Sequence, residues 1–281
     1  MRHLLSPYQP GRRHPDGQHC DQLGGQPPCG HPVDGIADGH AATTTTADSV
    51  DLDVCYRLPP VAAGEVHVRS NFVSSIDGAA ELDGRSGALG GSADRRIFRT
   101  LRWLADVVLV GAGTAVAEDY GPVVVPPERR ERRIATGQSA VPPVAVVSAS
   151  LRLAPSARLF AAQARPLVLT CEAAPPDRRK VLAEVADVLI CGNQTVDPAA
   201  ALRALGERGL DRVLCEGGPA LHADLANAGL LDELCVTLAP LLAGPDHLRI
   251  VRGQRWHTPL EMTLSHLLEE DGNLFLRYLR R

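Results

Sequence analysis

The chain has 281 residues, 44% of them hydrophobic, and a formal net charge of −4, with a pI near 6.2. That length is enough for one large domain or two small ones with a sizeable core. The slightly acidic balance gives no general attraction to nucleic acid or to an anionic membrane. No apolar run approaches the length of a membrane span, and the apolar part of residues 1–11 is too short for a signal peptide, so we expect a cytoplasmic protein.

The first 47 residues are rich in Gly, Pro, His, Asp and Thr and show no helical or strand period. We therefore expect a disordered tail over 1–47, followed by one domain over 48–281. The tail contains cysteines and histidines, but their spacing matches no zinc module, and we expect no metal site there. These residues are His14, His19, Cys20, Cys29, His31 and His40.

Residues 67–75 (HVRSNFVSS) alternate in the manner of a strand, and the sequence at 75–78 predicts a turn at its end. Asp77 lies in that turn. An aspartate in such a place either bonds its own backbone as a turn former or serves as a functional carboxylate. The next segment, 84–91, is rich in glycine and is predicted to be a loop that is able to lie against a ligand.

A helix is predicted over 92–104, with Ser92 as its N-cap and Asp94 in its first turn. The predicted buried stripe consists of Ile97, Phe98, Leu101 and Leu104. Three arginines, Arg95, Arg99 and Arg102, fall on another side of this helix. The spacing of Arg102 from the apolar stripe predicts an exposed side chain whose charge is available to a ligand.

Two short apolar strands each lead into a glycine turn. Residues 107–110 are followed by the sequence GAGT, and residues 213–215 are followed by Glu216, two glycines and a helix that begins at Pro219. Free N–H groups at a helix N-terminus favour a phosphate, and the predicted donors are Gly218, Ala220 and Leu221. Together the two turns fit a ligand with separated phosphates, although tight turns that need glycine and bind nothing remain an alternative.

The other elements complete an alternation of strands and helices. Residues 120–138 are predicted to be an exposed loop with solvated arginines. Strands are predicted at 144–147, 167–170 and 187–191, and helices at 176–184 and from Asp197 to near Gly209. After residue 231 the segments 233–238, 262–269 and 273–279 have no long helix between them. We therefore predict an α/β fold: a doubly wound, mostly parallel sheet with an antiparallel C-terminal edge.

Four motifs occur in one order: NFVSSIDG at 71–78, ADVVLVGAGT at 105–114, EGGPAL at 216–221 and LDELCVTLAP at 231–240. Together they resemble the dihydrofolate reductase-like pyrimidine reductases of riboflavin biosynthesis. The resemblance implies NADPH as hydride donor, a homodimer, and reduction of the ribosyl group of 5-amino-6-(5-phosphoribosylamino)uracil to ribityl. Bacterial members are often the C-terminal domain of a deaminase-reductase, but this chain has no zinc-deaminase motif, so the resemblance implies a stand-alone reductase.

Carried over residue by residue, the resemblance implies two sets of contacts. The implied cofactor contacts are Val73, Ala88, Thr114, Glu118, Gly218, Pro219, Ala220 and Leu221. The implied substrate contacts are Ser86, Arg102 and Glu216. Arg102 is suited to the phosphate of the substrate, and Glu216 is suited to accept hydrogen bonds from its ribityl or pyrimidine donors. The segment 148–152 follows a parallel strand, where it is suited to the 2′-phosphate of the cofactor.

The chain departs from the family after the GAGT turn. Where members commonly have the pattern D-N-P-x-L-T-x-R, residues 118–125 read EDYGPVVV, so the basic residue is absent. Either Arg129 or Arg130 supplies the charge from the loop, or the substrate is a different compound. The proton that accompanies hydride transfer has three candidate sources, namely Asp77, Glu216 and water.

Two other functions remain open from the sequence. One is a reductase of the same fold that acts on a pterin or dihydrofolate, which the absence of the basic residue near Val125 favours. The other is a nucleotide-binding or regulatory protein without enzymatic activity. Turnover of candidate substrates separates the first from the pyrimidine reductase, and tight NADPH binding without turnover identifies the second.

Overall fold

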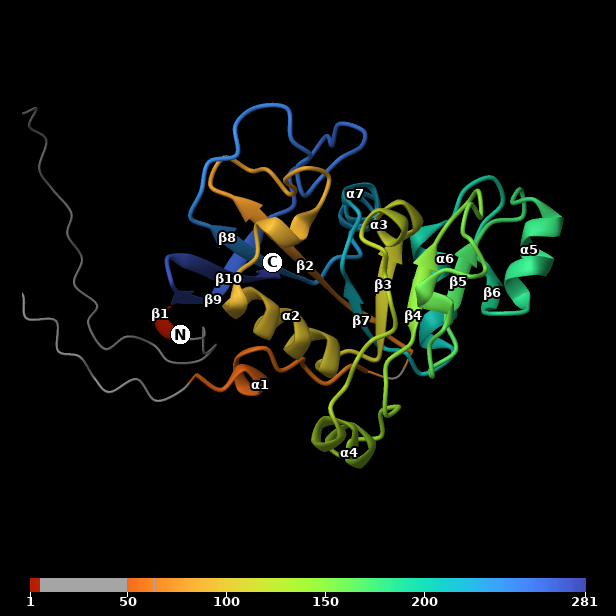
Figure 1. Cartoon of the computed structure of the whole chain (residues 1–281), viewed down its shortest axis with the longest axis horizontal. Helices are drawn as coiled ribbons and strands as arrows, with labels where there is room; N and C mark the ends of the chain where they lie inside the picture. The colour runs from red at the N-terminus through yellow and green to blue at the C-terminus, as the bar shows by residue number, and fades with distance from the viewer. Residues whose placement is uncertain (6–49, 63) are drawn as a thin grey trace, which may run out of the picture.

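A computed structural model describes residues 1–5, 50–62 and 64–281. Within these residues ten strands form one sheet in the order β1-β9-β10-β8-β2-β7-β3-β4-β5-β6 (Figure 1). The strands are β1 (Arg2–Leu5), β2 (His67–Ser75), β3 (Val107–Gly111), β4 (Val144–Val147), β5 (Leu167–Thr170), β6 (Asp187–Ile190), β7 (Arg212–Cys215), β8 (Glu233–Ala239), β9 (Met262–Glu270) and β10 (Asn273–Arg280). The helices are α1 (Leu52–Cys55), α2 (Ser92–Leu104), α3 (Ala112–Ala117), α4 (Pro127–Ala135), α5 (Pro176–Ala183), α6 (Pro198–Gly206) and α7 (Pro219–Asn227), with single 3₁₀ turns η1 (Ser86–Ala88) and η2 (Arg158–Phe160).

The strands from β8 through β2 and β7 to β6 run parallel, and β1, β9 and β10 pair antiparallel. This confirms the predicted mostly parallel sheet with an antiparallel edge. The parallel strands β3, β4 and β5 are nearly continuous apolar runs, as expected of strands that are covered on both faces. In β3, Val108 and Val110 pack into the cluster that contains Ile97 and Leu101 of α2, and Val107 and Leu109 pack into the opposite cluster with α6 and α7.

Several local signals were read correctly from the sequence. Asp197 caps α6, because its Oδ1 accepts the backbone N–H of Ala199 at 2.8 Å and of Ala200 at 3.2 Å. The strand β2 has the predicted bounds, and α7 begins at Pro219. Ser92, in contrast, is the first residue of α2 and not its cap, since Gly91 occupies the N-cap position. None of the described helices is long and apolar enough to span a membrane.

The expected tail over 1–47 needs a correction at its start. Residues Arg2–Leu5 form β1, which pairs antiparallel with β9, and the Arg2 Nε donates to Glu269 at 2.6 Å. This short segment joins the sheet because an edge strand, here β9, offers unpaired backbone groups. Residues 6–49 lie outside the described residues, and with them the cysteines and histidines considered for a metal site.

The prediction of an exposed loop over 120–138 was also wrong in part. Residues Pro127–Ala135 form α4, and Arg133 is buried. Its guanidinium donates to the carbonyls of Trp103 at 2.6 Å, Ala105 at 2.7 Å and Ser139 at 2.8 Å. A run of arginines therefore contains one side chain that satisfies the last carbonyls of α2, which no intrahelical donor reaches.

Candidate active site

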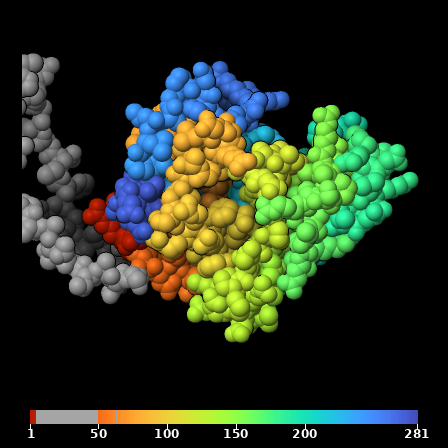
Figure 2. Space-filling model, viewed as in Figure 1, coloured from red at the N-terminus to blue at the C-terminus, as the bar shows by residue number. Residues whose placement is uncertain are grey.

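A cavity of about 650 Å³ lies at the carboxyl ends of β2, β3 and β7. It opens on the face shown in Figure 2, between the orange-to-yellow and yellow-green segments. Ligands of open α/β sheets bind at such strand ends. Nearly all the contacts implied by the resemblance line this cavity, namely Val73, Ser86, Arg102, Thr114, Glu118, Glu216, Gly218, Pro219, Ala220 and Leu221.

The two predicted glycine turns pack against each other on one wall of the cavity. The Gly111 N–H donates to the Gly217 carbonyl at 2.7 Å. Gly217 has φ of +102°, which favours glycine, and its peptide bond to Gly218 is cis. Gly218 has an ordinary φ of −67°, but a Cβ there would lie 2.5 Å from the Thr114 Oγ1. Gly218 is therefore glycine because the turns approach closely, and not because of its φ.

Backbone groups face the cavity at both turns. Gly218 is the N-cap of α7 and Pro219 its first residue, so the next N–H groups, of Ala220 and Leu221, have no partner one turn earlier in the helix. A Cβ built on Gly113 meets no atom within 4 Å, and Gly113 lines the cavity. The wall is thus open to close approach by a ligand with phosphate groups.

Arg102 and Glu216, two implied substrate contacts, bind each other. The Arg102 Nε and Nη2 donate to the two Glu216 oxygens at 2.6 Å each, and the Tyr120 hydroxyl donates to Glu216 at 2.8 Å. Arg102 also lies 4.2 Å from the ring centroid of Phe98. Burial alone would lower the pKa of Arg102, but Glu216 raises it above the ordinary value. The predicted exposed side chain is therefore wrong: the side chain of Arg102 is 17% exposed and paired.

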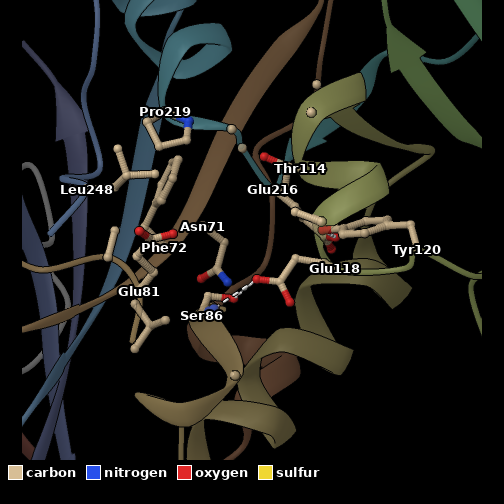
Figure 3. A pocket seen from close by; sticks show the side chains of 18 of the residues that line it. Asn71, Phe72, Glu81, Ser86, Thr114, Glu118, Tyr120, Glu216, Pro219 and Leu248 are labelled. Carbon is tan, nitrogen blue, oxygen red and sulfur yellow. Dashed lines mark hydrogen bonds between the residues drawn. The ribbon is translucent and has the colours of Figure 1, made fainter. Parts of the chain in front are cut away.

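Ser86 and Glu118 are joined in a similar way. The Glu118 carboxylate accepts the Ser86 N–H at 2.8 Å and the Ser86 hydroxyl at 3.0 Å. Figure 3 shows this contact beside the Asn71 side chain, with Glu216 and Tyr120 on the neighbouring wall. The contact fixes the glycine-rich segment 84–91 against the C-terminal end of α3.

Two of the candidate residues do not line the cavity, namely Asp77 and Ala88. The exposed Asp77 carboxylate accepts the N–H groups of Ala243 at 3.1 Å and Gly244 at 2.8 Å, as well as the Ser75 hydroxyl. The hydrogen bond from Ser75, followed by those from Ala243 and Gly244, lowers the pKa of Asp77 to about 2. The structure thus supports Asp77 as a turn former and not as the proton source near the ligand.

The structure also shows how the chain fills the position of the absent basic residue. Val125 is buried in the core. Arg129 pairs with Asp53 and lies over the Trp103 ring, and the Arg130 Nε donates to the Val125 carbonyl at 2.8 Å. Neither arginine lines the cavity, so the structure does not support the alternative in which one of them supplies the charge. The arginines that do line it are Arg95, Arg102 and Arg252.

Several cavity residues were not identified from the sequence. Asp94 and Phe98 were assigned only to the first turn and the buried stripe of their helix, and Tyr120 only to an exposed loop. Leu248 and Arg252 lie in the irregular segment between β8 and β9, which has no periodic signal. The Ala80 N–H donates to the Leu248 carbonyl at 2.7 Å, so this segment is held over the cavity by backbone contacts that no sequence pattern encodes. The remaining unpredicted residues include Asn71, Phe72 and Glu81.

Comparison with known proteins gives consistent relatives. Residues 66–274 match the model of the RibD C-terminal domain family. A 2,5-diamino-6-ribosylamino-4(3H)-pyrimidinone 5′-phosphate reductase of Archaeoglobus fulgidus is 31% identical over 63% of this chain and 82% of its own. Its namesake in Methanothermobacter thermautotrophicus is 29% identical over 73% of this chain and 94% of its own. The crystal structure of a pyrimidine reductase-like protein from Corynebacterium diphtheriae is 29% identical, with a TM-score of 0.73 over 82% of this chain and 98% of its own.

Proposed function

The chain belongs to the RibD C-terminal domain family, and on that premise we propose that it is an NADPH-dependent reductase of riboflavin biosynthesis. The substrate is 5-amino-6-(5-phosphoribosylamino)uracil or the 2,5-diamino compound named for the archaeal relatives. Its ribosyl group is reduced to ribityl. The observation that carries this proposal is the single cavity in which both glycine turns meet the Arg102–Glu216 pair.

The cofactor end of the cavity fits a dinucleotide. Gly218, Ala220 and Leu221 offer backbone donors to the diphosphate, and the open backbone at Gly113 lets it approach closely. When bound, NADPH supplies the hydride, and the protein supplies orientation and electrostatics. Val73, in the third pair from the end of the β2–β8 register, is an apolar support for the nicotinamide ring.

We assign the phosphate of the substrate to the arginines of α2. Arg102 uses its Nε and Nη2 for Glu216, which leaves the Nη1 donors of the same fork for a phosphate. Arg95 lies two helical turns earlier, lines the same cavity, and has only a 3.4 Å bond to the Gly90 carbonyl. These two cations replace the basic residue that is absent at Val125. Glu216 then orients Arg102 as well as accepting from the ribose or pyrimidine.

NADPH is proposed over NADH on the position of residues 148–152. This segment follows β4, the neighbour of β3, and Arg152 is exposed there. The Ser148 Oγ accepts the Leu151 N–H at 3.0 Å, which makes a compact turn at the strand end. An exposed guanidinium at this edge suits the 2′-phosphate of the adenosine. The five described cysteines are free and buried, in keeping with a reducing compartment such as the cytoplasm.

The antiparallel edge of the sheet supports the proposal of a homodimer. On β8 the residues Leu234, Val236 and Leu238 are half-buried and alternate with fully buried ones. Their partners on β10 are Tyr278, Leu276 and Leu274. Six such side chains form an apolar sheet face that a second copy of the same face is able to cover, since a two-fold interface is self-complementary.

The direct test is turnover with defined substrates. The purified chain should oxidise NADPH in the presence of the phosphoribosylamino pyrimidines, with kcat/KM at least about tenfold higher than with the same compounds lacking phosphate, because a charge-assisted contact contributes roughly 1.5 to 3 kcal/mol. Dihydrofolate is the comparison substrate. Faster reduction of dihydrofolate than of either pyrimidine would refute the proposed substrate class.

A further inference from the structure

Reduction of a ribosyl group requires a proton as well as a hydride, and the cavity contains several carboxyl groups that are candidates to donate it. Five carboxyl side chains line it: Glu81, Asp94, Glu118, Asp119 and Glu216. Three of them have committed partners. Glu216 accepts three bonds from Arg102 and Tyr120, Glu118 accepts two from Ser86, and Asp119 pairs with Arg158 on the surface. The oxygens of these three carboxyl groups are thus already engaged by protein groups.

Of the other two, Glu81 has no hydrogen bond or ion pair among the described residues that would fix its carboxyl group, whereas Asp94 is held in place. It lies in the first turn of α2, half-buried, and its Oδ1 accepts the Thr237 hydroxyl at 2.6 Å. Its Oδ2 lies against the α-carbon of Gly90, where a Cβ would be only 2.3 Å away. The position of this carboxyl group therefore depends on a hydroxyl from β8 and on the absence of a side chain at residue 90. Its second oxygen has no hydrogen-bond partner among the described residues.

The register of the sheet puts Asp94 close to the predicted position of the reacting carbon. Thr237 of β8 is paired with Val73 of β2, and side chains of paired residues on neighbouring strands lie on the same face. Val73 is the support proposed above for the nicotinamide ring. Because Thr237 holds Asp94, the carboxyl group lies beside the end of β2 at which hydride transfer is expected.

Burial of the Asp94 side chain favours its neutral form over the carboxylate. Burial, the largest effect, raises the pKa of Asp94, and the Thr237 hydrogen bond and the neighbouring Arg95 charge lower it less. Thr237 approaches from β8 and Gly90 from the preceding loop, and neither carries a charge. A half-buried carboxyl group with a raised pKa beside a ligand cavity is the usual form of a catalytic acid.

We propose that Asp94 is the proton donor of the reduction, an inference that rests on the proposed function. With the open imine form of the substrate, a C–H bond forms at C1′ from the hydride, the π pair of the C=N bond moves onto nitrogen, and nitrogen takes the Asp94 proton. With the closed ring, the C1′–O bond breaks and the ring oxygen takes that proton. Asp94 is left as a carboxylate and is reprotonated from water.

The test compares Asp94→Asn with the unchanged chain over a range of pH. Asparagine keeps the shape but carries no transferable proton, so kcat should fall on the order of 100-fold or more. NADPH affinity, measured by fluorescence titration, should change less than threefold. For the unchanged chain kcat should decrease as pH rises and Asp94 ionises, and this limb should be absent from the residual activity of the variant. The matched control is Asp187→Asn, which changes an exposed carboxylate of β6 that pairs with Arg165.

A second variant keeps the proposal testable if Asp94→Asn folds poorly. Gly90→Ala retains the carboxyl group but displaces it, and it should lower kcat at least tenfold with unchanged NADPH affinity. Turnover by Asp94→Asn within threefold of the unchanged chain, with the same alkaline limb, would overturn the role of Asp94 and leave the proposed function standing. An unchanged chain that reduces none of the pyrimidines would instead overturn the proposed function.

Discussion

At the scale of single residues, the Arg102–Glu216 pair has a structural cost as well as a proposed role. The Glu216 side chain is 1% exposed and that of Arg102 17%. Removing one member of a buried pair leaves an uncompensated charge, which typically costs about 3 to 5 kcal/mol. Arg102, which the resemblance implies as a substrate contact, thus also stabilises the fold.

Arg102→Ala is therefore expected to lower the free energy of unfolding by about 3 kcal/mol. Adding Glu216→Gln in that background should restore at least about 1 kcal/mol, because the unpaired charge is then removed. Urea unfolding of the two single variants and the double variant measures this coupling. If the losses in unfolding free energy of the two single variants simply add in the double variant, the two residues do not stabilise the fold as a pair. A rise in KM for the substrate in Arg102→Ala would then report ligand binding alone.

Asp94 gives a pH-dependent prediction about stability. A carboxyl group whose pKa is raised on folding contributes stability that is fully present below its unfolded value of about 3.8 and is lost as pH rises through the folded pKa. The melting temperature of the unchanged chain relative to Asp94→Asn should therefore decrease as pH rises from acidic values toward neutrality. A difference in melting temperature that is constant with pH would show that Asp94 does not titrate above its ordinary range.

The residues of the site divide into those that a local pattern reveals and those that it does not. The glycine turns and the start of α7 were identified because strand, glycine and proline follow one another within a few positions. The pairing of Arg102 with Glu216 joins residues 114 apart, and Thr237 reaches Asp94 over 143. Helical spacing indicated only that Arg102 was away from the core, and it carried no information about a partner on another element.

At the scale of elements, α4 shows how an arginine-rich segment is misread. The sequence PERRERRIA has little apolar character, so it was assigned to solvent, yet one of its arginines has the role of a buried cap. Arg133 reaches three carbonyls at the end of α2 and after α4. Burial lowers the pKa of Arg133 to about 10, which still leaves it charged at neutral pH.

Substitution of Arg133 should destabilise the chain more than substitution of a neighbouring arginine of α4. Arg133→Ala is expected to destabilise the chain by about 2 to 3 kcal/mol, because buried carbonyls lose a charged donor. Arg132→Ala is the matched control, since that side chain is 71% exposed and lies 3.5 Å from its partner Asp53, and it should cost less than about 0.5 kcal/mol. Equal effects of the two changes in chemical denaturation would contradict the capping role.

The contrast between local patterns and contacts distant in sequence also explains which elements were predicted. The parallel strands β3, β4 and β5 are short apolar runs between turn residues, and this local pattern was sufficient to predict them. The edge strand β1 was missed because its backbone bonds to β9, more than 250 residues later in the chain, stabilise it, and not its own sequence. Elements defined by a distant partner require the fold to be known first.

At the scale of the whole molecule, the half-buried apolar face of β8 and β10 supports the proposed dimer. Leu276 lies opposite Val236 in the middle of this face. Leu276→Lys should convert the dimer to a monomer, because two copies would each bury a charge against an apolar surface. Light scattering during size-exclusion chromatography measures the mass. The control is Leu242→Lys, because the Leu242 side chain is 75% exposed on a loop, and this change should leave the dimer intact. A monomeric mass for the unchanged chain would contradict the proposed dimer.

In the proposed reaction, hydride passes within the cavity from the nicotinamide to the ribosyl carbon of a phosphorylated pyrimidine. The most direct measurement uses NADPH labelled with deuterium at the transferred position of C4, together with the phosphoribosylamino pyrimidine, and mass spectrometry of the product. We expect a ribityl product that carries one deuterium at C1′. Product without deuterium, or deuterium found only in reduced dihydrofolate when both substrates are offered, would contradict it.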